Sequence, residues 1–336
     1  MDLPPTRPLA GGHRPARRRA AWALAAVVVA LATLVWWLSP MGRGSLRHGT
    51  VTVATGVPTG VYDLYGKLLA PVLRADLPGD RVRLLSSQGS VQNIDYVASG
   101  RADFTFAQAD AVADYHGPAR SRLRAVARLY DDYAQLIVPA GSGVTSARGL
   151  RGLRVGLGQS GSGVNLIARR ILTAAGLDPD RDITAVPAGI DTAPGMLRSG
   201  RLDAFFWSGG LPTGAVQTLS EHFPVKLVQL GDLIGPLNAL GAAARYYRSA
   251  VMPSDAYPDM RDSRAVPTIA VANLLITTDH EDPAVVQRVT QAVIDSRDRI
   301  GAVVHPAQQV DLRTAIYTDP LPLDEGARRY YLSVKP

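Results

Sequence analysis

Residues Leu153–Leu172, LRVGLGQSGSGVNLIARRIL, contain the pattern on which the fold prediction depends. An apolar strand runs into a loop of alternating glycine and serine, and the loop opens a helix whose apolar residues recur at near-helical spacing. A glycine loop at a helix N-terminus presents free backbone N–H groups and the positive end of the helix dipole. This stretch therefore predicts a strand–loop–helix unit that binds an anion.

The same strand–loop–helix order recurs along the chain, and two of its copies align. Residues 97–106 (VASGRADFTF) align without a gap with residues 197–206 (LRSGRLDAFF), and Gly89 falls opposite Gly189. Repeated units of this kind are typical of a mostly parallel α/β sheet. The repeat therefore predicts two similar α/β lobes that face one another.

Two apolar segments bracket the second copy and predict strands that cross between the lobes. They are Ala134–Pro139 and Pro267–Ile276, and a long amphipathic helix over residues 283–304 is expected to follow and pack on lobe 1. The crossing strands would act as the hinge. The expected divisions are residues 50–138 plus 268–336 for lobe 1 and residues 139–267 for lobe 2.

The positive charge of the chain is concentrated at its amino terminus. The formal net charge is +7, and residues 1–48 contain seven arginines against one acidic residue. The remaining residues hold 29 basic and 28 acidic side chains. Because this globular part is nearly neutral, the composition argues against nucleic-acid binding.

Residues 20–38 form an unbroken apolar run close to the length that a bilayer requires. Arg17, Arg18 and Arg19 precede the run, two tryptophans close it, and no convincing signal-peptidase site follows. We expect a globular part outside the cytoplasm on an uncleaved single-pass anchor, or a secreted protein if the segment is cleaved. The expected segments are a basic cytoplasmic tail (1–19), the transmembrane anchor (20–38) and a linker (39–49). The chain has no cysteine, which excludes disulfides and thiolate chemistry.

Ligands of open α/β sheets bind at the carboxyl ends of the strands, so six loops become candidates, three in each copy. The loop that ends at Gly60–Val61 corresponds to the loop that ends at Gly163–Val164. All six are rich in Gly, Ser, Thr, Gln or Asn, which suits a small polar solute enclosed by hinge closure. The candidate loops are residues 55–60, 87–90, 108–110, 158–163, 187–191 and 207–212.

Patterns of catalysis and cofactor binding are weak in this sequence. Residues 156–161 fit the dinucleotide pattern GxGxxG, which also needs an acidic residue about 20 positions on, at a strand end. Asp178, Asp180 and Asp182 lie near that distance, but in a turn before the next strand. Residues 158–163 miss the GxSxG spacing of serine hydrolases by one position, and the six histidines lack zinc-binding spacing. We predict a protein that is not an enzyme, with no metal and no cofactor.

Seven motifs follow one another along residues 50–336: Ala54-Thr-Gly56 with Gly60-Val-Tyr62, Gly89–Asn93, Arg101–Phe104 with Gln108–Asp110, Gly158 with Gly161–Gly163, Asp203–Phe206 with Gly209–Pro212, His305–Ala307 and Gly326–Tyr331. In this order they resemble the TAXI family of solute receptors that serve TRAP transporters. The resemblance implies a two-lobed, periplasmic-binding-protein-like α/β fold. It also implies capture of a small organic acid or amino acid, glutamate-like or a 2-oxoacid, and delivery to an ion-driven TRAP-type permease.

The resemblance implies solute contacts from the positions that match the family: Thr55, Gly56, Tyr62, Ser90, Asn93, Gln108, Ser162 and Gly163. The candidate loops and the helix starts beside them complete the expected ligand-binding set with Thr59, Gln88, Ser160, Asn165, Trp207 and Gly209. The family often has two tyrosines after its first glycine loop, whereas Tyr62 is followed by Asp63, an acid that could repel a dicarboxylate. The expected partners are a small anionic or zwitterionic solute, the permease and the membrane. The alternatives are a membrane-tethered ligand-sensing adaptor and a hydrolase of unrecognised type.

Overall fold

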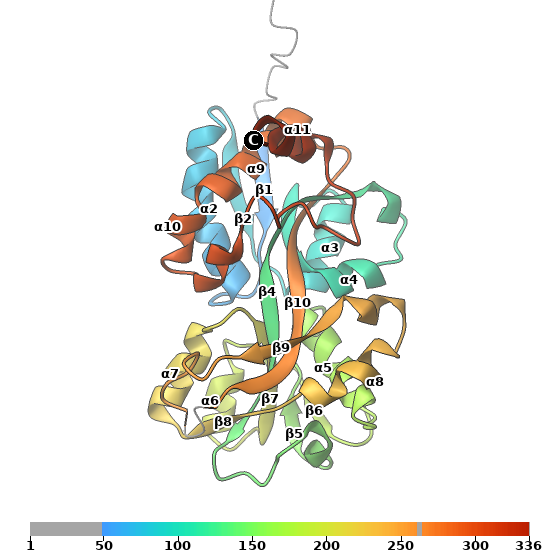
Figure 1. Cartoon of the computed structure of the whole chain (residues 1–336), viewed down its shortest axis with the longest axis vertical. Helices are drawn as coiled ribbons and strands as arrows, with labels where there is room; N and C mark the ends of the chain where they lie inside the picture. Colours follow the sequence, from blue (N-terminus) through green and yellow to red (C-terminus); the bar gives the residue numbers. More distant parts are fainter. Residues whose placement is uncertain (1–48, 261–263, 336) are drawn as a thin grey trace, which may run out of the picture. The chain divides into compact units, whose positions relative to one another are not determined.

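Two long antiparallel strands, β4 (Leu123–Pro139) and β10 (Val266–Thr278), join the two lobes of the structure (Figure 1). This computed structural model describes residues 49–260 and 264–335. The strands pair in the order β2-β1-β3-β10-β4-β7-β5-β6, so one sheet passes through both lobes. The crossing strands therefore form the part of the fold that the lobes share.

The expected cytoplasmic tail (1–19), the expected transmembrane anchor (20–38) and all but the last residue of the expected linker (39–49) lie outside the described residues. Within residues 49–260 and 264–335, no helix has the length and apolar content needed to cross a bilayer. The lobe divisions expected from the sequence stay predictions.

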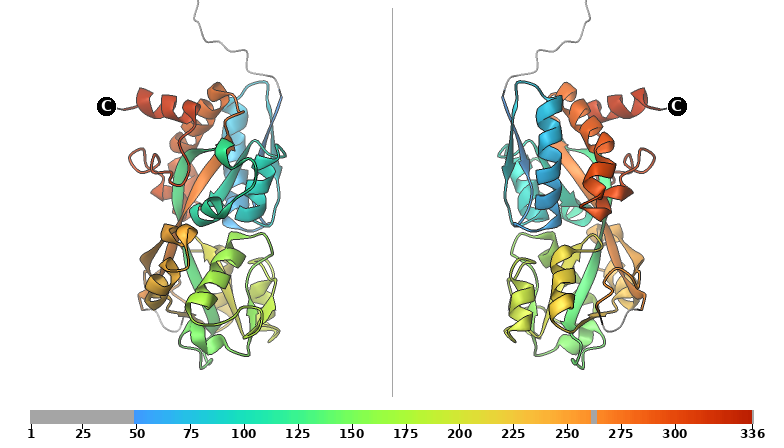
Figure 2. Two further views of the ribbon diagram at one scale, coloured as in Figure 1. Left: turned by 90° about the vertical axis from the view of Figure 1, so that its right-hand side faces the viewer. Right: turned by 90° about the vertical axis from the view of Figure 1, so that its left-hand side faces the viewer.

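The first lobe is built on three parallel strands that the crossing pair extends. β1 pairs in parallel with β2 and with β3, and β3 pairs antiparallel with β10. β1 and β3 are buried over nearly their whole length, because helices cover both faces of this sheet (Figure 2). The elements are β1 (Thr50–Ala54), α2 (Val61–Asp76), β2 (Arg81–Leu85), α3 (Ser90–Ala98), β3 (Phe104–Gln108), α4 (Ala109–Asp114), η1 (Arg120–Arg122), α9 (Pro283–Asp295), α10 (Arg297–Gly301), η5 (His305–Gln309) and α11 (Glu325–Ser333).

The second lobe repeats this arrangement on the other half of the crossing strands. β5 pairs in parallel with β6 and with β7, and β7 pairs antiparallel with β4. β8 pairs with β4 and β9 with β10, which widens the sheet on this side. The elements are η2 (Ala147–Leu150), β5 (Arg154–Gly156), α5 (Gly163–Ala174), β6 (Thr184–Val186), α6 (Ala193–Arg198), β7 (Ala204–Gly209), α7 (Gly214–His222), β8 (Val225–Val228), η3 (Gly231–Leu233), α8 (Ile234–Asn238), η4 (Ala242–Tyr246) and β9 (Tyr247–Met252).

The repeat in the sequence corresponds to a repeat of the same hydrogen bonds. Asp103 accepts a hydrogen bond from the backbone N–H of Thr52 in β1 (2.7 Å), and its own N–H donates to the Thr52 carbonyl (2.9 Å). Asp203 makes the same pair of bonds with Arg154 in β5, at 2.8 and 2.9 Å. Each aspartate thus ties the turn after a helix to the first strand of its lobe, which gives both residues a structural role.

Two segments differ from their predicted extents for identifiable reasons. β4 begins at Leu123, well before the predicted Ala134, because pairing with β10 stabilises a stretch whose charged residues hide the strand pattern. The tail predicted as one helix over residues 283–304 is divided into α9 and α10 at Ser296. The Ser296 hydroxyl donates to the carbonyl of Ala292, a local bond that competes with continued helix.

Candidate functional site

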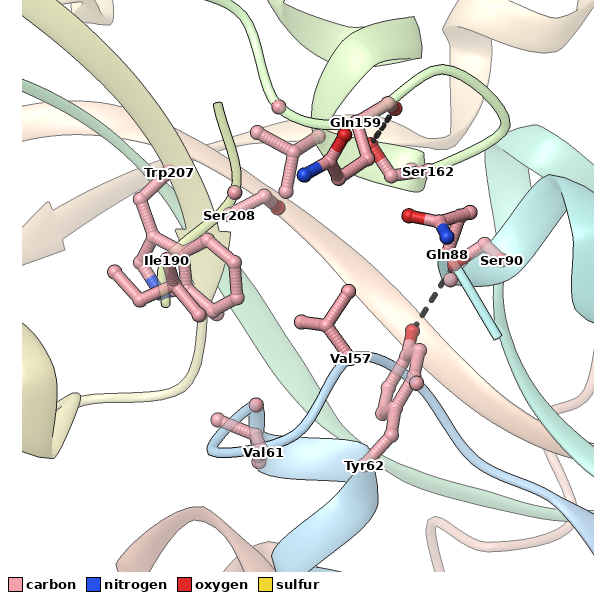
Figure 3. A pocket seen from close by; sticks show the side chains of 18 of the residues that line it. Val57, Val61, Tyr62, Gln88, Ser90, Gln159, Ser162, Ile190, Trp207 and Ser208 are labelled. Carbon is pink, nitrogen blue, oxygen red and sulfur yellow. Dashed lines mark hydrogen bonds between the residues drawn. The ribbon is translucent and has the colours of Figure 1, made fainter. Parts of the chain in front are cut away.

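A cavity of about 50 Å³ lies between the lobes, where the loops after the parallel strands meet (Figure 3). Both copies of the repeat contribute to its wall, and they do so at equivalent positions. The equivalent pairs are Gly60–Val61 with Gly163–Val164, Gly89 with Gly189, and Gln108 with Ser208. The cavity is therefore a product of the repeat, because each lobe supplies the same parts of its strand–loop–helix units.

Nine of the fourteen residues predicted for the ligand site line this cavity. They come from the carboxyl ends of β3 and β7, and from the loops and helix starts that follow β1, β2 and β5. They are Gly56, Tyr62, Gln88, Ser90, Gln108, Ser162, Gly163, Trp207 and Gly209. Their role in binding stays a prediction, but the structure brings them together.

Thr55 and Asn93, which the resemblance implied as solute contacts, do not line the cavity. Asn93 is completely buried, and its amide donates to the carbonyls of Thr55 and Phe106 while its oxygen accepts from Ser87. These bonds use the whole amide to hold the ends of β1 and β3 together. The structure thus gives Asn93 a structural role at these strand ends, and the solute contacts of Thr55 and Asn93 stay a prediction.

Ser160, Asn165 and Thr59 also lie outside the cavity wall. Ser160 is exposed on the turn before α5, and the backbone N–H of Asn165 donates to the Ser162 hydroxyl at 3.0 Å in the helix cap. Thr59 is exposed and lines a wider neighbouring groove. A glycine- and serine-rich loop offers many polar residues, and the turn geometry decides which of them face inward.

The cavity also contains residues that the predicted set omits, and Asp132 is the most consequential of them. It comes from the crossing strand β4, outside every candidate loop, in the pair Asp131-Asp132. Two acids in the middle of a long strand are a signal that could have indicated a site. The omitted lining residues are Val57, Gly60, Val61, Gly89, Asp132, Gly158, Gln159, Val164, Gly189, Ile190 and Ser208.

Asp132 and Gln108 form a buried polar pair in the cavity wall. The Nε2 of Gln108 donates to Asp132 Oδ2 at 2.7 Å and to the Ser208 hydroxyl at 2.8 Å. The two side chains are 3% and 2% exposed, and both Asp132 Oδ1 and Gln108 Oε1 lack a hydrogen-bond partner. Burial raises the pKa of Asp132 to about 6, while the amides of Gln108 and the nearby Asn273 act to lower it. Unpartnered buried acceptors are costly, so this pair favours a donor from a ligand.

The hydroxyl groups of the cavity are already committed to the protein. The Tyr62 hydroxyl shares a hydrogen bond with Ser90 at 3.2 Å and donates to Asn273 Oδ1. The Ser162 hydroxyl caps α5 and donates to the Gln159 carbonyl at 2.6 Å (Figure 3). None of the described residues that line the cavity is a histidine that could activate this serine. The arrangement fits binding better than nucleophilic catalysis.

The lobes touch directly beside the cavity through glycines. The N–H of Gln92 donates to the Gly161 carbonyl of the other lobe at 3.0 Å. A side chain at Gly163 would overlap Gln108 Oε1 and lie 2.9 Å from the Ser90 hydroxyl. A Cβ atom at position 163 would therefore force the side chains of Gln108 and Ser90 to move, and glycine allows the close contact of α3 with α5 in the present arrangement.

A second contact between the lobes is an ion pair away from the cavity. Arg170 of α5 lies 3.2 Å from Asp110 Oδ2 and 3.0 Å from Asp114 Oδ1, both on α4. The hydroxyl of Tyr247, in β9, donates to Asp110 and accepts from Arg170 at 3.0 Å. Burial raises the pKa of the fully buried Asp110, and the bond to Tyr247 and the charge of Arg170 oppose this rise. The group links elements from both lobes in the present arrangement.

Comparison with known proteins supports the fold at the level of a family. The model of the NMT1-like family matches residues 53–332. A solved protein from Bordetella bronchiseptica RB50 is similar with a TM-score of 0.55 and 16% identity, over 84% of this chain and 97% of that chain. The alkanesulfonate-binding protein SsuA from Xanthomonas axonopodis pv. citri, bound to MOPS, has a TM-score of 0.47 and 17% identity, over 85% of this chain and 84% of that chain. An ancestral arginine-binding protein bound to arginine has a TM-score of 0.48 and 15% identity, over 76% of this chain and 97% of that chain.

The structure confirms the predicted α/β fold of two lobes, and the solved protein from Bordetella bronchiseptica has a similar fold. The comparisons do not support the finer expectation of a TAXI receptor with a TRAP-type permease.

Proposed function

Because this chain belongs to the NMT1-like family, we propose that it is an extracytoplasmic receptor that encloses a small solute between two lobes. The receptor passes the solute to a membrane permease without changing it chemically. A TRAP-type permease rests on the TAXI resemblance alone, and the membrane tether rests on the apolar run at residues 20–38.

One observation carries the proposal: the cavity is built from equivalent positions of both lobes. A cavity with walls on two lobes changes shape when the lobes move about the crossing strands, so occupancy and closure are coupled. Its polar groups include two buried acceptors that lack partners, which a solute can satisfy. Concave sites with a few convergent polar groups are typical of small-molecule binding.

A thermal-shift screen of the full-length chain in detergent tests the proposal against amino acids, amines, 2-oxoacids, sulfonates and dicarboxylates. A solute that binds only the folded state at 100 times its Kd stabilises by about 2.7 kcal/mol. At about 2 °C per kcal/mol, the expected rise in Tm is about 5 °C. The recovered solute should be chemically unchanged.

A matched pair of variants on one loop provides the control. Ser162→Trp fills the cavity and should abolish the shift, whereas Ser160→Trp, on the exposed turn, should preserve it. Equal shifts for both variants would show that the cavity does not bind the solute. No shift with any compound class would contradict the receptor proposal.

A further inference from the structure

The charge of the cavity wall limits which solutes it can accept. Among the lining residues within 49–260 and 264–335, Asp132 is the only charged one, and none is a lysine, an arginine or a histidine. A dicarboxylate placed here would face a buried acid with no basic side chain to balance it, and burying uncompensated like charges is costly. We infer that the solute carries a protonated amino group bound by Asp132, and that acids without such a group are not ligands. This inference rests on the proposed receptor function and names its ligand class.

The hydrogen-bonding pattern beside Asp132 fits an ammonium group. Among the described residues, Asp132 Oδ1 and Gln108 Oε1 are cavity-lining acceptors without a hydrogen-bond partner, and Asn273 Nδ2 near Asp132 is an unpartnered donor. The Gln108 Nε2 is already committed to Asp132 and Ser208, so this side chain can offer the ligand only its oxygen. An ammonium carries three donors and no acceptor, and it can satisfy both oxygens. A carboxylate has only acceptors and can satisfy neither of them.

The rest of the wall accommodates the other parts of a small amine or amino acid. Figure 3 shows Val57, Val61, Ile190 and Trp207 on one side of the cavity, and Gln88, Ser90 and Ser162 on the other. The apolar side suits a short hydrocarbon group. The helices α3 and α5 begin at the cavity-lining residues Ser90 and Gly163, and the positive ends of their dipoles favour a single carboxylate of a zwitterion on the polar side.

The size of the cavity favours a compact molecule. A water molecule needs on the order of 10–15 Å³ of such space, so a cavity of about 50 Å³ holds only a few atoms of that size. Alanine and short amines are therefore better candidates than glutamate. A larger amino acid requires wider separation of the lobes than this structure has.

Matched pairs of compounds on one carbon skeleton test the inference by isothermal titration calorimetry with the full-length protein in detergent. The pairs are alanine with pyruvate, valine with 3-methyl-2-oxobutanoate, and glutamate with 2-oxoglutarate; isobutylamine adds an amine without a carboxylate. We expect the amino compound of at least one pair to bind about 100-fold more tightly than its oxoacid. This comparison uses the unchanged protein and so does not depend on the folding of a variant.

A pair of variants on β4 locates the charge that is recognised. Asp132→Asn should weaken binding of the amino compound about 10- to 100-fold, because a hydrogen bond between charged groups is lost. Asp131→Asn should leave affinity unchanged, since Asp131 bonds with Arg128 and Arg248 and does not line the cavity.

The outcomes separate the inference from the proposed function. Binding of oxoacids alone, or full affinity in a folded Asp132→Asn variant, overturns the inference and leaves the receptor in place. Absence of binding for every compound, sulfonates and dicarboxylates included, overturns the receptor proposal as well.

Discussion

Replacing Arg170 by alanine measures how much the ion pair between the lobes contributes to stability. The guanidinium is 16% exposed and bonds with a completely buried Asp110, with Asp114 and with Tyr247. Removal of one member of a buried pair leaves an uncompensated charge and typically costs 3–5 kcal/mol. Because the Tyr247 hydroxyl still donates to Asp110, we expect the lower end, about 3 kcal/mol less free energy of unfolding at pH 8.

The adjacent arginine provides the control. Arg169 lies 2.9 Å from Asp180 within the second lobe, where the two side chains are 38% and 70% exposed. Pairs on the surface contribute about 0.2–1 kcal/mol, so Arg169→Ala should lower the free energy of unfolding by less than 1 kcal/mol. Urea unfolding of full-length protein, followed by circular dichroism, compares the two variants on the same helix.

The effect of pH on the Arg170→Ala variant has a definite sign. Arg170 acts against the rise that burial causes in the pKa of Asp110, so the variant should have a still higher pKa at this residue. At low pH the carboxyl is protonated in both proteins, and the loss of stability should shrink as the pH falls from 8 towards 4. A loss below 1 kcal/mol at pH 8, equal to that of Arg169→Ala, would refute the reasoning.

Two further predictions concern the cavity. Gly163→Ala should weaken solute binding at least 10-fold, because its Cβ would overlap Gln108 Oε1. Gly195→Ala in α6, with open space around it, should leave binding unchanged in the same calorimetric assay. Equal affinities of the two variants would show that the lobes need not meet at Gly163. Asp132→Asn should raise the free energy of unfolding of the unliganded protein at pH 8 by about 2–3 kcal/mol, because a folded-state pKa of about 6 against a usual 3.8 makes ionised Asp132 destabilising. That gain in stability should disappear near pH 4, where the carboxyl is protonated in the folded protein. Urea unfolding at pH 8 and at pH 4 measures the gain. An equal gain at the two pH values would contradict the raised pKa of Asp132.

The fold was predictable because the signals for it are local and repeated. The alignment of residues 97–106 with residues 197–206 indicated two lobes, and glycine-rich loops after apolar strands indicated where the lobes meet. Both signals come from backbone requirements that short stretches of sequence express directly. The same alignment places Gln108 opposite Ser208, and the structure joins these two residues by a hydrogen bond.

The charge of the site was not predictable in the same way. Asp132 lies on a strand whose predicted extent began at Ala134, because Arg124, Arg128 and the acid pair interrupt the apolar pattern. Only pairing with β10 makes this stretch a strand, and only the crossing of the lobes places Asp132 beside Gln108. The expectation of an anion site came from glycine loops and helix starts, which say nothing of an acid contributed from elsewhere in the chain.

The side chain of Gln108 takes part both in the charge of the cavity and in the contact between the lobes. Its amide bonds with Asp132 of the crossing strand β4 and with Ser208 of the second lobe, and its oxygen lies against the position of Gly163. A mutation that reverses the charge preference at position 132 would also remove the acceptor that orients this amide, and so would disturb the contact between the lobes. A basic residue at position 132 would therefore need a compensating change at position 108, whereas asparagine at position 132 keeps an oxygen that can accept from Gln108.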